Sequence, residues 1–418
     1  MKLRLSICLV LAATLALIFP AIAAQPRLIS AWVQLAPGNV AEARAVVDGT
    51  ACPVITIDGK TDSMRLRAAA NTAFPNLLCA ATLATGIHKI SVLGRELPPP
   101  VVSPQSILVI GDTGCRIKGL AVQDCNDPSK WPFPHVAEVA AKLKPDLILH
   151  VGDYLYRENA CPIGDAGCAG SPSGDNWASW SADFFAPAAP LFAAAPLIFV
   201  RGNHEECARS GAGWLRLLGP LPVDPKTPCV DHVTPWPLSL GNVTLAVMDD
   251  SHAPMITSPD DLVTLYRSDF AAVGQMTPPV WLAMHIPIWG VIELPFGIVT
   301  GGNPTLMAAQ EPKGIPSAVS LLLAGHIHTF EAIDYDKDSP PQIIAGEGGD
   351  LLDHAPRDLS GRSIGALKIT SGLSLPGYGF LLITRARPGW KIRVLSQEGA
   401  QQAICLFINR HLDCHANN

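Results

Sequence analysis

The stretch Leu197-Ile198-Phe199-Val200-Arg201-Gly202-Asn203-His204-Glu205 decides the expected fold of this chain. Its first four residues are apolar and two of them are β-branched, which predicts a buried strand, and Gly202 marks the point where that strand turns. Polar side chains follow at the carboxyl end of the strand, where open α/β sheets place their ligands. The stretch therefore predicts one strand of an α/β sheet and one part of a site at its end.

Four other stretches repeat this order of a hydrophobic run followed by polar side chains. They are Ile107–Ile110 before Gly111-Asp112-Thr113-Gly114, Leu147–Val151 before Gly152-Asp153-Tyr154-Leu155-Tyr156, Trp281–Met284 before His285, and Leu321–Ala324 before Gly325-His326-Ile327-His328. Helical segments are expected between several of these runs, and alternating strands and helices are typical of an α/β or layered α+β domain.

The polar residues that follow the five runs are carboxylates, imidazoles, a phenol and an amide. A single such residue at a strand end is usually a cap or turn residue, but five coincidences are not expected by chance. Together these groups are hard-to-borderline ligands that suit Fe, Zn or Mn rather than Ca. There are enough of them for two ions, and ions ~3.5–4 Å apart are the usual apparatus for hydrolysing phosphate esters. The residues are Asp112, Asp153, Tyr156, Asn203, His204, His285, His326 and His328.

Residues 1–23 have the three-part plan of a cleavable secretory signal. Lys2 and Arg4 precede an apolar run from Leu5 to Phe19, and the small-residue triplet Ala21-Ile22-Ala23 follows. A membrane anchor is the alternative, but the run is shorter than the ~20 residues that span a bilayer. We therefore expect a periplasmic or secreted protein that has no membrane association after cleavage.

Cysteine usage agrees with export. The chain has 11 cysteines, and ten remain once Cys8 leaves with the signal. We expect five disulfides between sequence neighbours in an oxidising compartment, although spacing alone does not fix the pairing. A cysteine metal site is the alternative, but no C-x-x-C spacing occurs. The expected pairs are Cys52 with Cys79, Cys115 with Cys125, Cys161 with Cys168, Cys207 with Cys229, and Cys405 with Cys414.

The amino-acid composition limits the classes of protein to which the chain can belong. The chain has a net charge of −6, with 48% hydrophobic and 16% charged residues, so it can bury a full core and carries no basic footprint for nucleic acid. Residues 24–102 contain short β-prone segments between turn residues, which predicts a small β-rich N-terminal domain. Pro98-Pro99-Pro100 is a stiff linker from that domain to a second one over residues 103–418.

The ordered set Gly-Asp-x-Gly, Gly-Asp-x-x-Tyr, Gly-Asn-His-Glu, a strand-borne His and Gly-His-x-His spans Gly111 to His328. It resembles the calcineurin-like metallophosphoesterases, and within them it is most similar to the purple acid phosphatases. The resemblance implies a β-sandwich core flanked by helices. It also implies an exported enzyme that hydrolyses phosphate monoesters of a small substrate with two metal ions.

By the same resemblance, the first metal is held by Asp112, Asp153, Tyr156 and His328. Asp153 bridges to a second metal, which is also held by Asn203, His285 and His326. A phenolate ligand requires Tyr156 to lose its proton well below its ordinary pKa of ~10, which suits Fe(III) at the first site. The neutral donors of the second site suit Fe(II), Zn or Mn.

The implied reaction is in-line attack of a metal-bound hydroxide on phosphorus. His204 is the expected donor of a proton to the leaving oxygen, and Glu205 either orients His204 or is an exposed loop acid. Asn203 and His204 are expected to contact the substrate. Arg157 and Arg201, which sit beside the metal-binding loops, are candidates to bind phosphate or are surface residues.

One departure from the plant-type purple acid phosphatases concerns the substrate. Those enzymes carry a pair of histidines shortly after the strand-borne His, whereas no His lies between His285 and His326 here. A phosphodiesterase or nucleotidase on the same metal frame is therefore the alternative enzyme. A binding protein on an inactive phosphoesterase fold is the alternative outside enzymes, but all seven expected metal ligands are present.

Overall fold

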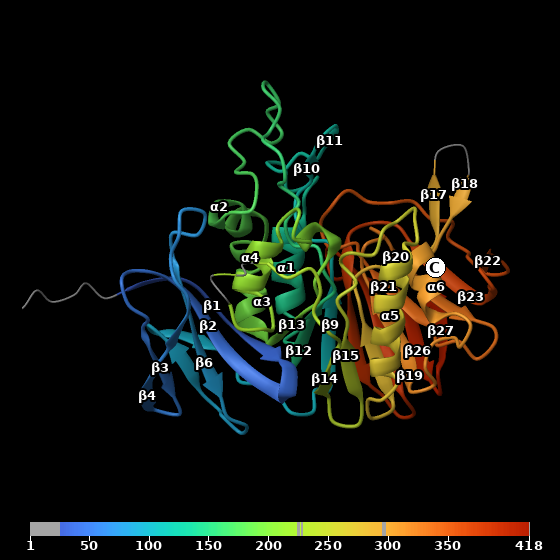
Figure 1. Cartoon of the computed structure of the whole chain (residues 1–418), viewed down its shortest axis with the longest axis horizontal. Helices are drawn as coiled ribbons and strands as arrows, with labels where there is room; N and C mark the ends of the chain where they lie inside the picture. Colours follow the sequence, from blue (N-terminus) through green and yellow to red (C-terminus); the bar gives the residue numbers. More distant parts are fainter. Residues whose placement is uncertain (1–25, 224–225, 227–228, 295–297, 418) are drawn as a thin grey trace, which may run out of the picture.

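The computed structural model describes residues 26–223, 226, 229–294 and 298–417. Two large β-sheets and a few short helices make up this part of the chain, which confirms the expected layered α/β fold (Figure 1). The expected signal over residues 1–23 lies outside the described residues. Among the described helices, none is long and apolar enough to cross a membrane.

The first sheet has 11 strands in the order β27-β26-β25-β24-β9-β12-β13-β1-β2-β6-β5. Its centre is parallel, because β12 pairs with β9 on one side and with β13 on the other in the same direction. The strands are β1 (Arg27–Ala36), β2 (Val40–Asp48), β5 (Arg65–Ala68), β6 (Leu77–Leu83), β9 (Ser106–Ile110), β12 (Leu147–His150), β13 (Leu197–Phe199), β24 (Gly379–Arg385), β25 (Trp390–Ser396), β26 (Gln401–Ile408) and β27 (His411–Ala416).

The second sheet has eight strands in the order β14-β15-β16-β19-β21-β20-β23-β22. Four neighbouring strands, from β15 to β21, run parallel to one another. The strands are β14 (Trp236–Ser239), β15 (Thr244–Val247), β16 (Val280–Ala283), β19 (Val319–Ala324), β20 (Phe330–Tyr335), β21 (Gln342–Ala345), β22 (Ser363–Ile364) and β23 (Leu367–Leu375).

Smaller elements complete the described chain. One four-stranded sheet contains β3 (Val54–Ile57), β4 (Lys60–Ser63), β7 (Ile90–Val92) and β8 (Arg95–Leu97), and two hairpins contain β10 (Ile117–Lys118) with β11 (Ala121–Val122) and β17 (Ile292–Leu294) with β18 (Ile298–Thr300). The helices are α1 (Phe133–Ala141), α2 (Trp177–Trp180), α3 (Ala189–Ala194), α4 (Gly211–Leu217), α5 (Asp260–Val273) and α6 (Pro304–Gln310).

The second sheet is buried on both faces, and its strands show the two-residue alternation that follows from β geometry. Along β16, Trp281 faces the first sheet, where its ring packs 4.8 Å from that of Trp390. Leu282 faces the opposite way and joins the cluster that contains Phe270 of α5. Full burial of one such side chain contributes about 1.5–3 kcal/mol. These layers confirm the β-sandwich core flanked by helices.

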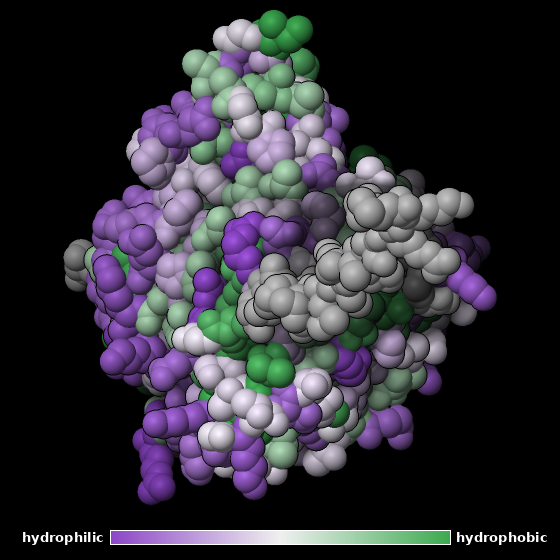
Figure 2. Space-filling model, turned by 90° about the vertical axis from the view of Figure 1, so that its left-hand side faces the viewer, coloured by the Kyte–Doolittle hydropathy of each residue, from purple (hydrophilic) through white to green (hydrophobic). Residues whose placement is uncertain are grey.

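The N-terminal strands continue the first sheet. β1 pairs in parallel with β13 and antiparallel with β2, while Ala31, Val33 and Ile55 form a separate core with the four-stranded sheet. Figure 2 shows this end of the molecule, where hydrophilic and hydrophobic residues are intermixed on the surface. The described part of residues 24–102 has the expected β-rich character, and the domain boundary near residue 102 stays a prediction.

Each of the five predicted disulfides is present. They join Cys52 to Cys79, Cys115 to Cys125, Cys161 to Cys168, Cys207 to Cys229 and Cys405 to Cys414. Two of the bridges start three residues after a predicted site residue, at Cys115 after Asp112 and at Cys207 after His204. Cross-links of this kind restrict the unfolded chain and so stabilise the loops that they close.

Arg44 joins the N-terminal strands to the helical side of the molecule. Its fully buried guanidinium group pairs with Glu42 at 2.8 Å and donates hydrogen bonds to the carbonyl groups of Leu217 and Gly219 at 2.9 and 3.0 Å. These two carbonyls lie at and just beyond the end of α4, where a helix leaves its last carbonyls without partners. A cation at this end also interacts favourably with the helix dipole.

We expect Arg44→Met to lower the free energy of unfolding by about 3 kcal/mol, because it leaves the Glu42 carboxylate and two carbonyls buried without this donor. Denaturant unfolding of the oxidised protein measures the change. The matched control is Arg27→Met, since Arg27 pairs with Asp48 at 3.1 Å in an exposed position and should cost less than about 0.5 kcal/mol. Equal losses for the two variants would contradict the assigned role of Arg44.

Candidate metal centre

The seven predicted ligands lie together where the parallel strands of both sheets end. Asp112, Asp153 and Tyr156, and Asn203 follow β9, β12 and β13 of the first sheet, whereas His285 and the pair His326 and His328 follow β16 and β19 of the second sheet. The carboxyl ends of parallel strands share one edge of a sheet, and the two sheets bring these edges together. Most of the seven side chains are buried, and only Asn203 and His326 are partly exposed.

Four of these side chains form a first cluster around the phenol of Tyr156. Its hydroxyl oxygen lies 3.0 Å from Asp112 Oδ1, 2.8 Å from Asp153 Oδ2 and 3.1 Å from His328 Nε2. The hydroxyl has one hydrogen and three neighbours that accept hydrogen bonds. The phenol can therefore donate to only one of these three neighbours.

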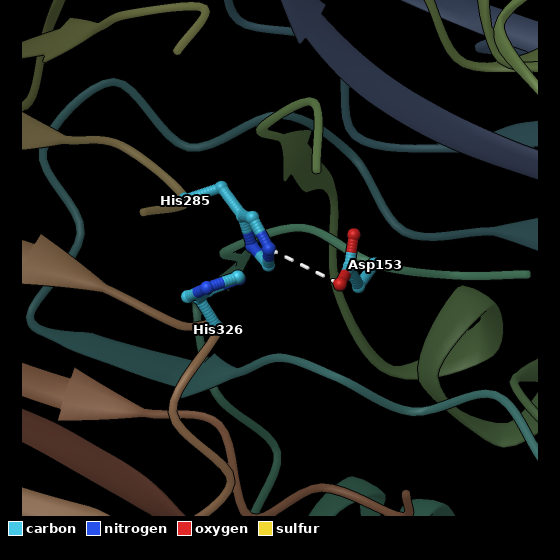
Figure 3. A group of neighbouring side chains, drawn as sticks. All are labelled: Asp153, His285 and His326. Carbon is cyan, nitrogen blue, oxygen red and sulfur yellow. Dashed lines mark ion pairs between the residues drawn. The ribbon is translucent and has the colours of Figure 1, made fainter. Parts of the chain in front are cut away.

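A second cluster shares Asp153 with the first. Asp153 Oδ2 lies 3.1 Å from His285 Nε2, and Asn203 Oδ1 lies 3.0 Å from that same nitrogen and 2.9 Å from His326 Nδ1. Figure 3 shows Asp153, His285 and His326 with their polar ends directed toward one another. The ligand atoms of these three residues all lie within 4.8 Å of one another.

In His285 and His328, the hydrogen bond made by Nδ1 shows that Nε2 is the nitrogen available to bind a metal. His285 Nδ1 lies 2.8 Å from the carbonyl oxygen of Val151, and His328 Nδ1 lies 2.6 Å from that of Leu351. A carbonyl only accepts, so both Nδ1 atoms carry hydrogen. When these rings are neutral, they direct the lone pair of Nε2 at the carboxylates, the arrangement typical of histidine ligands.

Both clusters fit metal ions. In the neutral tautomers the lone pair of His285 Nε2 meets two oxygen acceptors with no hydrogen between them, so a cation is the group that satisfies all three. Ligands that bind one ion at ~2.1 Å and at right angles lie ~3.0 Å apart. The contacts between neighbouring ligand atoms in the two clusters range from 2.8 Å, between Tyr156 and Asp153, to 3.3 Å, between His328 and Asp112.

The backbone at three ligands adopts a conformation that non-glycine residues rarely adopt. The φ angles are 56° at Asp112, 56° at Asp153 and 71° at His326. Such residues cost about 1–3 kcal/mol each and persist where the surrounding structure holds them. Here each follows a glycine at a strand end, and the turn directs its side chain to the centre.

Two glycines that directly precede predicted ligands are required because other ligand loops pack directly on them. A Cβ atom on Gly152 would lie 2.3 Å from His285 Nδ1, and one on Gly202 would lie 2.1 Å from Asp153 Oδ1. Both distances are far below van der Waals contact. Each glycine therefore leaves the space that a ligand from another loop occupies, a requirement that the sequence alone did not reveal.

His204 lies against the first cluster, and its carboxylate partner is Glu158. The ring centre of His204 is 3.9 Å from that of Tyr156, and its Nδ1 lies 2.7 Å from Glu158 Oε1. Its Nε2 lies 3.8 Å from Asp153 Oδ2. Sequence reasoning missed Glu158, although its position two residues after Tyr156 placed it on the same loop.

Glu205 has a different role from either one expected. It is buried rather than exposed, and its carboxylate accepts hydrogen bonds from backbone N–H groups rather than from the His204 ring. The donors are Gly202, Asp153, Tyr154 and Leu155. Glu205 therefore fixes the loop that carries Asp153, and Glu158 takes the position predicted for Glu205.

The two arginines predicted to bind phosphate are engaged inside the fold. Arg157 is buried, and its Nε donates to Asp183 at 2.5 Å. Arg201 is buried and donates to Asp249 at 3.1 Å, to the carbonyls of Glu205 and Val230 at 2.8 Å, and to the sulfurs of the Cys207–Cys229 bridge. These contacts do not support the expected phosphate binding by either arginine.

A partly exposed arginine lies nearer to the centre and was missed from the sequence. Arg116 pairs with the buried Asp350, and its guanidinium carbon is 4.9 Å from the ring centre of Tyr156. Asp350 also lies 3.5 Å from His328 Nδ1. The cation and its carboxylate partner thus border the first cluster.

The buried charges favour positive charge in the centre. Burial alone would raise the pKa of Asp153, but attraction to His285 and His204 outweighs it and holds that pKa well below its usual value. Burial would lower the pKa of His285, but Asp153 and other carboxylates raise it to about 10. The pKa of His328 is likewise raised to about 9, against burial, mainly by Asp350 and Asp112.

Loading the metal-free protein at pH 7 should release one proton each from His285 and His328, because both pKa values lie above 7 and both nitrogens must be free to bind, and a further proton from Tyr156 when it binds as phenolate. Metal affinity should therefore rise with pH up to ~9 and fall as the pH is lowered. Titration calorimetry with Zn²⁺ in buffers of different ionisation enthalpy counts the protons. His285→Gln should reduce the count by about one, and heats independent of the buffer would contradict the assignment.

Comparison with known proteins agrees with this geometry. The sequence model of the calcineurin-like phosphoesterase family matches residues 105–330. No curated protein matches the chain in sequence. The fold is similar to that of a purple acid phosphatase from yellow lupin (Lupinus luteus) seeds, with a TM-score of 0.57 and 12% identity over 90% of this chain and 73% of that one. It is also similar to PhoD, with a TM-score of 0.55 and 14% identity over 96% of this chain and 94% of that one.

The matched region is more than half of the chain and contains each of the seven predicted ligands. It also contains the strands that they follow, which are β9, β12 and β13 of the first sheet and β16 and β19 of the second. The chain therefore belongs to the calcineurin-like phosphoesterase family and is a metal-dependent phosphoric ester hydrolase.

Proposed function

We propose that the protein is an exported phosphomonoesterase, acid phosphatase-like, that works with two metal ions. The observation that carries this proposal is the position of Asp153. Its Oδ2 atom lies 2.8 Å from the hydroxyl of Tyr156 in one cluster and 3.1 Å from His285 Nε2 in the other. One carboxylate that serves two ligand sets is suited to bridge two ions.

The two ligand sets favour different ions. Asp112, Tyr156 and His328 complete the first set and suit Fe(III), whereas Asn203 and the other two histidines complete the second set and suit Fe(II), Zn or Mn. When bound, such ions lower the pKa of water and neutralise the charge on phosphoryl oxygens.

His204 is proposed to give a proton to the leaving oxygen. Burial lowers its pKa to about 4, although the nearby carboxylates of Asp153 and Glu158 act in the opposite direction. An imidazole with this pKa carries its proton mainly in acid, which suits an acid phosphatase. Glu158 Oε1 lies 2.7 Å from Nδ1 of this ring, and Nε2 lies on the side of Asp153, 3.8 Å from its Oδ2.

Export is proposed from two features. Five disulfides hold the described chain, and such bonds persist in oxidising compartments. The first 23 residues have the plan of a secretory signal. The proposed location is the periplasm or the exterior of the cell.

The test of the function is hydrolysis of phenyl phosphate, a monoester, compared with methyl phenyl phosphate, its diester. We expect kcat/KM for the monoester to be at least about tenfold higher, and removal of metal by a chelator to abolish turnover. Faster turnover of the diester would favour a phosphodiesterase instead. No turnover of either ester by metal-loaded protein would refute the proposal.

The same assay tests His204 and Glu158. His204→Gln should lower kcat by about 10²-fold or more, and the loss should be larger for alkyl than for phenyl esters, because alkoxides need the proton more. Glu158→Gln should show the same dependence with a smaller loss. Glu206→Gln is the control, since Glu206 lies on the same loop and pairs at 3.3 Å with His252 instead. A loss of kcat that is equal for alkyl and phenyl esters would contradict the role of His204.

The identity of the first metal is tested by colour. Tyr156 bound as phenolate to Fe(III) should transfer charge to the metal, so that the protein absorbs visible light, and Tyr156→Phe should remove the band. Tyr154→Phe is the control, because the Tyr154 hydroxyl donates to the carbonyl of Val200 at 2.7 Å and should leave the band intact. A colourless, fully active, iron-free protein would refute the tyrosinate but leave a Zn or Mn phosphoesterase in place.

A further inference from the structure

A cavity of about 260 Å³ lies where β23 leads into β24 and where β25 ends. Its lining comes from both sheets, because Phe330 and Leu375 belong to the second sheet and Gly379 and Val394 to the first. None of the seven predicted metal ligands lines it. The cavity is therefore separate from the metal centre.

Glu347 is the buried acid of this cavity. It is 2% exposed, and both of its carboxylate oxygens lack a hydrogen-bond partner among the described residues. The adjacent Gly346 packs on a metal loop instead, since a Cβ atom there would lie 2.2 Å from the carbonyl oxygen of Ile327. A buried carboxylate without a partner is costly, so its position in the wall of a cavity points to a bound group.

A second acceptor lines the same cavity. The Oε1 atom of Gln397 is buried and also lacks a partner within the part of the chain that the structure describes. Backbone bonds hold both residues at the loop between β23 and β24. The N–H of Gly379 donates to the carbonyl of Glu347 at 3.0 Å, and the N–H of Gln397 donates to the carbonyl of Tyr378 at 2.8 Å. The cavity thus has three acceptor oxygens that no described residue serves.

A proton alone does not satisfy these oxygens. Burial and the charge of Asp112 raise the pKa of Glu347 to about 8, so the carboxyl takes up a proton near neutral pH when nothing is bound. One proton supplies one donor, whereas three oxygens need donors. A primary ammonium group carries three N–H donors and a positive charge, which matches one carboxylate and one amide oxygen.

The charge and the polarity of the lining select the kind of cation. No lysine, arginine or histidine lines the cavity, and its other acid, Glu398, pairs with His135 at 2.9 Å in an exposed position. Apolar side chains, among them Phe330, Leu375 and Leu395, form much of the wall. A hard ion such as Ca²⁺ takes about six to eight oxygen ligands, which suits an apolar wall poorly. An organic cation with an apolar part fits both the charge and the wall.

We propose that this cavity binds a small primary ammonium compound, with the ammonium group on Glu347 and Gln397 and the alkyl chain on the apolar wall. The inference goes beyond the proposed function and does not depend on it. Gln397 is placed to admit the ligand, because its side chain is only partly buried and its Oε1 makes no hydrogen bond that holds it. Rotation of this side chain opens the way to the carboxylate.

The test is titration calorimetry of the metal-loaded, oxidised protein with n-butylammonium chloride at about pH 9. At this pH the Glu347 carboxyl is ionised, and the amine, like a lysine side chain with its pKa of ~10.4, keeps its proton. We expect saturable binding with a Kd of about 1 mM or below. Binding of n-butanol, which lacks the charge, and of tetramethylammonium, which lacks N–H donors, should be at least about tenfold weaker. Absence of saturable butylammonium binding would overturn the inference.

Variants assign the binding to the two side chains. Glu347→Gln removes the charge with little change of shape and should weaken binding at least about tenfold. Gln397→Met keeps the length of the side chain but removes its carbonyl oxygen, and should weaken binding about fivefold. The control is Glu398→Gln, which should change the affinity by less than about twofold, because Glu398 is exposed and already paired with His135.

Each outcome bears on a distinct part of the inference. Equal affinity for n-butanol and n-butylammonium would overturn the cation site and leave an apolar pocket. Undiminished binding by Glu347→Gln, or an equal loss in Glu398→Gln, would overturn the assignment to Glu347. Circular dichroism shows whether each variant is folded, and if Glu347→Gln is not, the partly exposed Gln397→Met variant decides the question. All of these results are independent of the hydrolysis of phenyl phosphate, which tests the proposed function.

Discussion

The structure depends on the burial of carboxylates next to imidazole nitrogens that cannot all be satisfied by hydrogen. Asp153 and Asp112 are almost completely buried, and each contacts a histidine nitrogen and the single hydroxyl of Tyr156. Buried charges of this kind are costly unless a partner neutralises them. The raised pKa of His285 shows that, without metal, a proton supplies the positive charge. The folded chain therefore places buried carboxylates where bound cations are needed to balance their charge.

This need for cations explains why the positions of the ligand loops around the centre are closely fixed. The loops that carry the ligands come from two different sheets, and they meet at glycines whose Cβ atoms would collide with neighbouring ligands. The Glu205 carboxylate then binds several backbone N–H groups of the Asp153 loop and its neighbour, which fixes that loop. Precise positions of ligands are what make a metal site selective and reactive.

The side chains around the metal centre are positioned by their own contacts. Arg116 and Arg209 are held by buried or half-buried carboxylates, so their positions follow from ion pairing. The Met255 sulfur contacts His326 Nε2 at 3.1 Å and Asn303 Nδ2 at 3.7 Å, so its position follows from contacts with the ligand loop and with α6.

Sequence by itself determined the α/β class and the set of candidate ligands, and it favoured the five disulfide pairs, because strands, cysteines and ligand residues are recognised from local pattern and order along the chain. Tertiary structure decided which groups meet. The structure showed that Glu158, rather than Glu205, lies against His204, and that Arg157 and Arg201 are buried in the interior. It also joined the N-terminal strands to the first sheet. Such contacts link residues far apart in the chain or depend on side-chain direction, and local pattern carries no information on either.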